Sequence, residues 1–444
     1  MIPLEGSAVA PAQADRGGTV SNIARRVSWG LLDQVLSSGS NFALSAFVAA
    51  TVSATAFGAF TVVYAVYGLC VGLSAGLASI PLVVRYSAGS PARYRAATRA
   101  SVGTALGVGT LLALMCLAAS LLTAPSVQGP LRALGVTLPG LLTQDAWRYS
   151  FVTGGRPAKA AANDGLWVAL QLLGIAALLA DGAVSASSMV LVWGGSASAA
   201  AVLGCWQAGL IPAPNRAPRW LREQRAFTWR YAGEAVVHRS GWWLAVAFVG
   251  AVAGLRVTGA VRGAMLILGG PLNLLFIGAT FAFVSESVRL VHRSPALLPA
   301  AMRSLSAVTT AAAVAWCAIV LALPDAVGSR VLGATWHQAK PLLPLLVAFI
   351  VALATSMGAT QGMLALGAAK RSLFTQVVCL GIDASTMTAG ALIAGARGAV
   401  IAVGFAAVFR TVLAWVQFRR ALREPIRSGG VEPPDKVLTA AAAS

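Results

Sequence analysis

The sequence predicts an all-α polytopic membrane protein, with about twelve transmembrane helices in two six-helix lobes around a central cavity and both termini in the cytoplasm. Three observations favour this fold class. Of the 444 residues, 57% are hydrophobic and 11% are charged, whereas a typical soluble domain is about 25% charged. The apolar residues form successive runs near the ~20 residues that span a bilayer. The basic residues between these runs gather in alternate connections.

The predicted spans are apolar windows bounded by charges or by Gly/Pro clusters. They lie near residues 28–50, 58–81, 101–123, 130–152, 165–181, 184–210, 231–254, 259–284, 304–324, 341–367, 373–395 and 398–418. The fourth window is interrupted by charge and the fifth is short, so the count ranges from eleven to thirteen.

The distribution of Lys and Arg predicts the orientation, because basic residues resist translocation across the membrane. With the N-terminus inside, the cytoplasmic segments hold 24 of the 33 basic residues. Six lie on the opposite side, namely Arg132, Arg256, Arg262, Arg330, Lys340 and Arg397, and three lie within spans, namely Arg148, Arg239 and Arg410. The net charge of +19 is therefore dispersed over short loops, which is atypical of nucleic-acid binding and suits an anionic inner leaflet.

The chain divides near its middle. We expect disordered cytoplasmic tails at 1–24 and 421–444, an N-terminal lobe at 25–210, a cytoplasmic linker at 211–230 and a C-terminal lobe at 231–420. A shift of 201 residues places Asp33 on Glu234 and Gly58 on Gly259. Both lobes begin inside and cross six times, so they are predicted to be parallel repeats related by an axis along the membrane normal.

The first predicted helix is unusually polar for a membrane span. At about 100° per residue, one arc of it carries Asp33, Gln34, Ser37, Ser38, Ser40, Asn41 and Ser45. Lipid cannot solvate a carboxylate, so this arc is predicted to face protein or water.

Charged residues also fall within other predicted spans, where each costs about 2.5 kcal/mol or more at the bilayer centre. We expect them to line the central cavity. The predicted substrate-binding residues are Arg148, Arg239, Arg410 and Asn41, and the predicted coupling or charge-pairing residues are Asp33, Asp145, Glu234, His238 and Asp383. Two alternatives stay open: Asp33 and Glu234 reach the nearby cytoplasmic interface, or Asp145 and Arg148, which share a helix face, form a structural pair.

No catalytic constellation is visible. The sequence has no phosphate-binding loop and no H-E-x-x-H motif, and its three histidines lie in separate regions. Its five cysteines fall inside apolar runs without paired spacing. We therefore expect neither an enzyme nor a metal site, and no cofactor apart from coupling to H⁺ or Na⁺.

Several stretches resemble a known family: "RRVSWGLLDQ" in the first span, "FGAF" opening the second, and "LLTQDAWRYSFVTGGRPAKAAANDGLW" across the fourth and fifth. They resemble the O-antigen/teichoic-acid flippase branch of the multidrug/oligosaccharidyl-lipid/polysaccharide exporter superfamily. The resemblance implies a secondary flippase that moves a polyprenyl-diphosphate-linked oligosaccharide between leaflets by alternating access, with cavity arginines on the diphosphate. The chain departs from that pattern because its predicted cavity acids equal or outnumber the bases.

Two other classes of protein compete with the flippase. A cation- or proton-coupled multidrug exporter of the same superfamily would give the main role to Asp33, Glu234 and Asp383. A scaffold or a lipid-glycan polymerase or ligase is disfavoured, because the longest outer connection, 325–340, carries few groups for sugar transfer. The expected partners are a lipid-linked glycan, membrane lipids and polysaccharide-assembly proteins, and the expected location is the plasma (inner) membrane.

Overall fold

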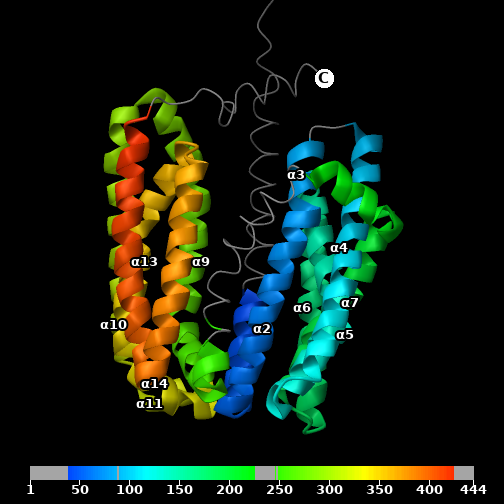
Figure 1. Ribbon diagram of the computed structural model, residues 1–444, viewed down its shortest axis with the longest axis horizontal. Helices are drawn as coiled ribbons and strands as arrows, with labels where there is room; N and C mark the ends of the chain where they lie inside the picture. The colour runs from blue at the N-terminus through cyan, green and yellow to red at the C-terminus, as the bar shows by residue number, and fades with distance from the viewer. Residues whose placement is uncertain (1–38, 88–89, 226–245, 247–248, 425–444) are drawn as a thin grey trace, which may run out of the picture.

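The computed structural model describes residues 39–87, 90–225, 246 and 249–424. Within these ranges every regular element is a helix. Figure 1 shows the helices as two bundles standing side by side, one built from α2 to α7 and the other from α9 to α14. Seven of the described helices are long and apolar enough to cross a membrane. The chain is therefore an all-α, multi-pass membrane protein, as predicted.

The N-terminal bundle begins with helical residues 39–51. They are followed by α2 (Ala54–Ser74), a π-helical turn (Ala75–Ser79), α3 (Ile80–Tyr86), α4 (Pro91–Ser120), α5 (Pro125–Thr153), α6 (Pro157–Ala180) and α7 (Ala186–Ala208). Proline occupies the first helical turn of α4, α5 and α6, where its fixed φ suits the helix and its missing N–H costs nothing. A capping box between Ser185 and Ser188 opens α7, and Gly209 in the left-handed region closes it.

The C-terminal bundle contains two short helices among its long ones. It comprises α9 (Leu255–Arg293), α10 (Leu298–Leu321), α11 (Asp325–Leu332), α12 (Trp336–Ala339), α13 (Leu343–Ala365) and α14 (Ala369–Leu422). The 54-residue α14 is broken by non-helical backbone at Ala394 and Gly395. It therefore holds the eleventh and twelfth predicted spans, which turn back on each other at a close contact between Gly390 and Gly398.

The predicted windows coincide with the described helices from the second window to the sixth and from the eighth to the twelfth. Only parts of the first and seventh windows are described, with helical residues at 39–50 in the first and at 246 and 249–253 in the seventh. The predicted N-terminal tail and all but the first residues of the predicted C-terminal tail lie outside the described residues. The domain boundaries stay predictions.

The described part of the predicted linker packs against the N-terminal bundle. Residues 217–225 are helical, and Trp220 stacks on Tyr86 of α3 with ring centroids 5.6 Å apart. The Trp220 Nε1–H donates to the carbonyl oxygen of Leu77, inside the π-helical turn, at 3.1 Å. Gln224 donates to the Tyr86 hydroxyl at 3.1 Å and accepts from Arg85 at 2.6 Å. The linker helix is thus fastened to the point where α2 changes to α3.

The two bundles meet where α2 crosses α9. A Cβ atom added at Gly58 would overlap the backbone of Leu255, and one added at Gly259 would overlap the carbonyl oxygen of Ala54. Leu255 lies 201 residues after Ala54, and Gly259 lies 201 residues after Gly58. The crossing is therefore symmetric under the offset that relates the two halves of the sequence. Two glycines allow the backbones to approach this closely.

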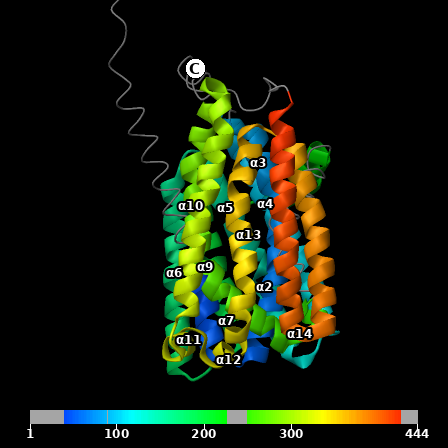
Figure 2. The same ribbon diagram turned by 90° about the vertical axis from the view of Figure 1, so that its left-hand side faces the viewer.

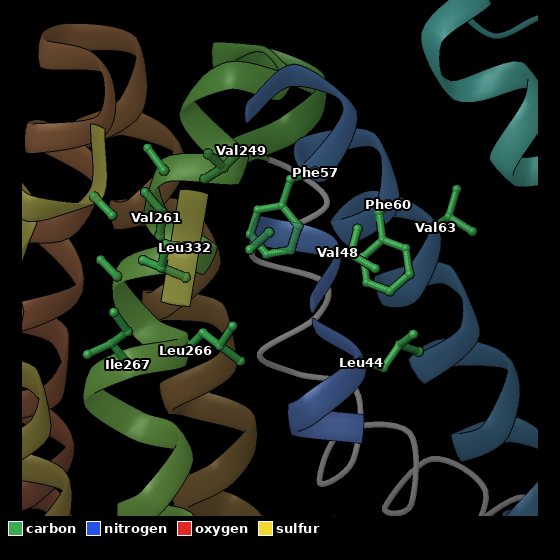
Figure 3. Packing of buried hydrophobic residues seen from close by; sticks show 14 of the residues in the cluster. Leu44, Val48, Phe57, Phe60, Val63, Val249, Val261, Leu266, Ile267 and Leu332 are labelled. Carbon is green, nitrogen blue, oxygen red and sulfur yellow. The ribbon is translucent and has the colours of Figure 1, made fainter. Parts of the chain in front are cut away.

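A hydrophobic cluster surrounds this crossing, which we call the α2/α9 seam. Figure 3 shows side chains from both halves facing one another: Leu44, Val48, Phe57, Phe60 and Val63 from one, and Val249, Val261, Leu266, Ile267 and Leu332 from the other. The Thr335 hydroxyl adds a hydrogen bond to the carbonyl oxygen of Ala49 at 3.4 Å. The halves thus meet through a largely apolar surface.

The seam lies toward one end of the molecule. Its α2 residues come from the beginning of that helix, and Figure 1 shows the bundles adjacent at this end and well apart at the other, where α3 ends. The beginning of α2 follows the first predicted outer loop, whereas the end of α3 leads to the arginine-rich connection after Arg85. The positive-inside rule therefore assigns the seam to the outer side.

We expect Gly58→Ala to lower the stability of the protein, because the added methyl overlaps the α9 backbone and overpacking costs about 1–3 kcal/mol. The measurement is thermal unfolding in detergent. Gly195→Ala is the matched control, since Gly195 is also helical and a Cβ atom added there would meet no atom within 4 Å. Equal melting temperatures for the two variants would contradict the close crossing.

We expect Trp220→Ala to release the linker helix, because it removes both the ring stack and the hydrogen bond to the π-helical turn. Trypsin should then cleave after Arg222 or Arg225 several-fold faster. Trp206→Ala serves as the control, since Trp206 is 81% exposed. Trp220→Phe keeps the stack and loses a hydrogen bond worth about 1 kcal/mol, so its cleavage rate should be intermediate.

Candidate functional site

Four of the predicted site residues lie outside the described residues: Asp33, Glu234, His238 and Arg239. The other five, Asn41, Asp145, Arg148, Asp383 and Arg410, are described, and they occupy both halves of the protein.

In the N-terminal half, Arg148 of α5 forms an ion pair with Asp164 of α6, with 3.6 Å between its Nε and the Asp164 Oδ2. The Asp164 side chain is fully buried and that of Arg148 is 22% exposed. Asp145 lies almost one turn before Arg148 on α5 and is 9% exposed. A fully buried carboxylate needs a positive partner and hydrogen bonds to hold its charge, and Arg148 supplies the charge.

Amide side chains extend this ion pair into a network that joins three helices. The Gln144 amide donates to Asp164 Oδ1 at 2.7 Å, and the Asn163 amide donates to Gln207 of α7 at 3.0 Å and to the carbonyl oxygen of Ala200 at 2.8 Å. Asn163 and Asp164 are both 0% exposed. The network therefore fixes α5, α6 and α7 relative to one another in the interior of this half.

In the C-terminal half, Arg410 forms a hydrogen-bonded ion pair with Asp383. Asp383 lies before the break in α14 and Arg410 after it, so the pair joins the two antiparallel segments of this element. The Asp383 side chain is 8% exposed and that of Arg410 is 32% exposed. The two predicted residues are thus brought together, with the carboxylate almost covered.

The structure does not bring the two ion pairs together, because each lies inside its own bundle. Asn41 belongs to neither pair. It lies half-buried on the helix 39–51, and its carbonyl oxygen accepts a hydrogen bond from Ser45 at 2.9 Å. The described residues therefore form two separate charged centres, one in each half.

A further arginine lies inside a helix. The sequence counts Arg262 among the outer-side residues, and the structure places it two turns inside α9, with its guanidinium 6.0 Å from the centre of the Tyr64 ring of α2. Tyr64 in turn lies 5.4 Å from the Trp193 ring of α7, and Tyr67 packs edge-on against Trp193 at 4.6 Å. Arg262 is thus a half-buried cation that bridges the two halves beside the seam. Arg262 falls inside the eighth predicted window, 259–284, and this position already indicates that it belongs to a helix.

Among the described residues, no group of three or more His, Cys, Asp or Glu side chains could hold a metal ion.

We expect Asp383→Asn and Arg410→Gln each to destabilise the protein by about 3 kcal/mol, because removing one member leaves the other charge uncompensated in a largely buried place. The double variant should lose less unfolding free energy than the two single variants lose together. The measurement is a double-mutant cycle of thermal unfolding in detergent. Additive losses would mean that the two side chains do not interact.

No family model matches the chain, and no curated protein matches it. Solved structures do match over nearly its whole length. An inward-facing multidrug resistance MATE family transporter of the MOP superfamily aligns with a TM-score of 0.66 at 15% identity, covering 89% of this chain and 97% of the other. An outward-facing structure described in the same words aligns with a TM-score of 0.62 at 16% identity, covering 94% and 98%.

A third match is a MOP superfamily transporter from Pyrococcus furiosus, described as having a binding pocket of reverse polarity that suggests a different function. It aligns with a TM-score of 0.53 at 11% identity, covering 91% of this chain and 96% of the other. All three matched proteins are transporters. At these identities the likeness is one of fold, and the chain therefore has the fold of MATE transporters of the MOP superfamily.

Proposed function

We propose that the protein is a secondary transporter that flips a polyprenyl-diphosphate-linked oligosaccharide, a precursor of surface polysaccharide, from the inner to the outer leaflet by alternating access. The observation that carries the proposal is the presence of arginines inside helices that the sequence predicts to span the membrane, in both halves of a transporter fold, namely Arg148, Arg262 and Arg410. The planar guanidinium donates two parallel hydrogen bonds to phosphate oxygens, which suits a diphosphate.

The stretch that resembles polysaccharide flippases supports the same cargo. Residues 141–167 contain Gln144, Arg148, Asn163 and Asp164, which are the members of the buried network between α5 and α6. The stretch that resembles the flippases therefore includes the residues that connect α5 to α6. An arginine held by a buried carboxylate keeps a fixed direction, as a binding residue requires.

The α2/α9 seam suits a state that is closed on the outer side. It joins the halves at the end that the positive-inside rule assigns to the outer side. A cargo made in the cytoplasmic leaflet would enter from the opposite side. Transport then requires the seam to open, and its apolar surface can separate without breaking a large set of ion pairs.

Multidrug export is the second candidate, and one observation favours it: two of the matched structures are described as multidrug resistance transporters. In that case the carboxylates would carry the coupling ion, H⁺ or Na⁺, and the arginines would balance them. For either cargo we propose the plasma membrane as the location. For the flippase we also propose polysaccharide-assembly proteins as partners.

The test is transport in proteoliposomes that hold the purified chain. A fluorescent polyprenyl-diphosphate glycan in one leaflet should reach the other, where a membrane-impermeant quencher reports it, and a lipophilic cation dye should show little uptake. The opposite pattern, dye transport without glycan movement, would replace the flippase with the drug exporter.

We expect Arg262→Gln to lower glycan flipping at least tenfold, because it removes a guanidinium that bridges the two halves beside the seam. Arg256→Gln is the matched control, since Arg256 begins the same helix and is exposed. Both variants should keep the wild-type melting temperature within a few degrees. Unchanged flipping by folded Arg262→Gln would exclude Arg262 from transport.

A further inference from the structure

A groove runs along the C-terminal half on the face turned away from the N-terminal half. Figure 2 looks onto this face, where α10, α13 and α14 lie side by side. The groove has a volume of about 500 Å³ and is lined by α10, by Thr355 of α13 and by Trp415 of α14. A second hollow of about 250 Å³ continues it and also contains Arg303 and Trp415. This face meets lipid in a membrane, so the groove is open to the bilayer.

The hydroxyl groups of the groove are already engaged with the protein. Ser306 donates to the carbonyl oxygen of Thr355 at 2.8 Å, and the hydroxyls of Thr310 and Thr355 lie 3.0 Å apart. The Trp415 Nε1–H donates to the same carbonyl oxygen at 3.1 Å. These bonds fix the floor and hold the indole ring across it. They leave the cationic side chains as the groups able to recognise a ligand.

Two arginines flank the end of the groove. Arg303 lies in the second turn of α10 and Arg419 in the last turn of α14, and both line the second hollow. Both side chains are exposed, and among the described residues neither has an ion pair. These helix ends lie on the predicted cytoplasmic side. Basic pockets between helices at this level bind anionic lipid headgroups, and a neighbouring tryptophan is typical of the membrane interface.

The deeper part of the groove suits an acyl chain. Ala307 and Ala311 lie about one and two turns below Arg303 along α10, and both line the groove. Their small side chains leave the space open. Val308 of α10 and Val412 of α14, which are 65% and 58% exposed, add apolar surface on the two neighbouring helices. A polar, cationic end and an apolar length match a phospholipid.

We propose that this groove binds an anionic phospholipid of the cytoplasmic leaflet. The phosphate lies between the guanidinium groups of Arg303 and Arg419, the headgroup contacts the edge of Trp415, and one acyl chain follows the groove past Ala307 and Ala311. None of the residues that line the site belongs to the seam or to either charged centre. The site therefore does not depend on which cargo the protein carries.

The test is native mass spectrometry of the full chain in detergent, titrated with phosphatidylglycerol, phosphatidylcholine or inorganic phosphate. The wild type should retain phosphatidylglycerol in preference to phosphatidylcholine. Arg303→Gln and Arg419→Gln should each reduce that preference about fivefold, the ratio expected for one basic residue near an anionic surface. Arg420→Gln should leave it unchanged, since Arg420 is exposed beside Arg419 and does not line the groove.

A second variant separates the groove from general surface charge. Ala307→Phe fills the apolar length and should weaken the binding of both phospholipids, while its melting temperature without added lipid stays close to that of the wild type. The proposal is overturned if Arg420→Gln lowers the preference as much as Arg303→Gln does. It is also overturned if Ala307→Phe binds both lipids normally, or if inorganic phosphate alone displaces phosphatidylglycerol at micromolar concentration.

Discussion

The close crossing of α2 and α9 is the constraint on which the arrangement of the two halves depends. Two glycines bring the backbones within contact, and apolar side chains from both halves close around them. A membrane offers no hydrophobic driving force between helices, so close van der Waals packing is what holds such a contact. Packing of this kind acts over a short range, and it can hold the halves at one end while the other end stays apart.

Each half contains a buried ion pair of its own. Arg148 is neutralised by Asp164 and Arg410 by Asp383, and each pair also ties helices of its own bundle together. Each bundle can therefore move as a unit without carrying an uncompensated charge through lipid. Arg262 differs because the contact described for it crosses to the other half, onto the ring of Tyr64. Its surroundings therefore change when the halves separate.

Much of the fold could be predicted from the sequence, because hydrophobic length and basic loops are local signals. The errors arise where a partner lies on another helix. Helix α6 begins at Pro157, eight residues before the fifth predicted window, because apolar windows end at charged residues and Asp164 is a charged residue that is fully buried, like Asn163. Helical spacing reveals neighbours on one helix, so it suggests a pair between Asp145 and Arg148 but cannot reveal the contact of Arg148 with Asp164, which lies on another helix. The outer connection 325–340 contains the short helices α11 and α12, which a search for membrane-length apolar windows cannot reveal.

The symmetry of the seam has a consequence for how the two halves are joined. Residue 54 contacts residue 259 and residue 58 contacts residue 255, so the two sides of the contact are the same surface repeated after 201 positions. That is the isologous pattern of a two-fold homodimer. Two copies of one six-helix half would form this contact with the same surface. In a single chain the glycine pair keeps the two halves in contact while each half carries its own buried charges.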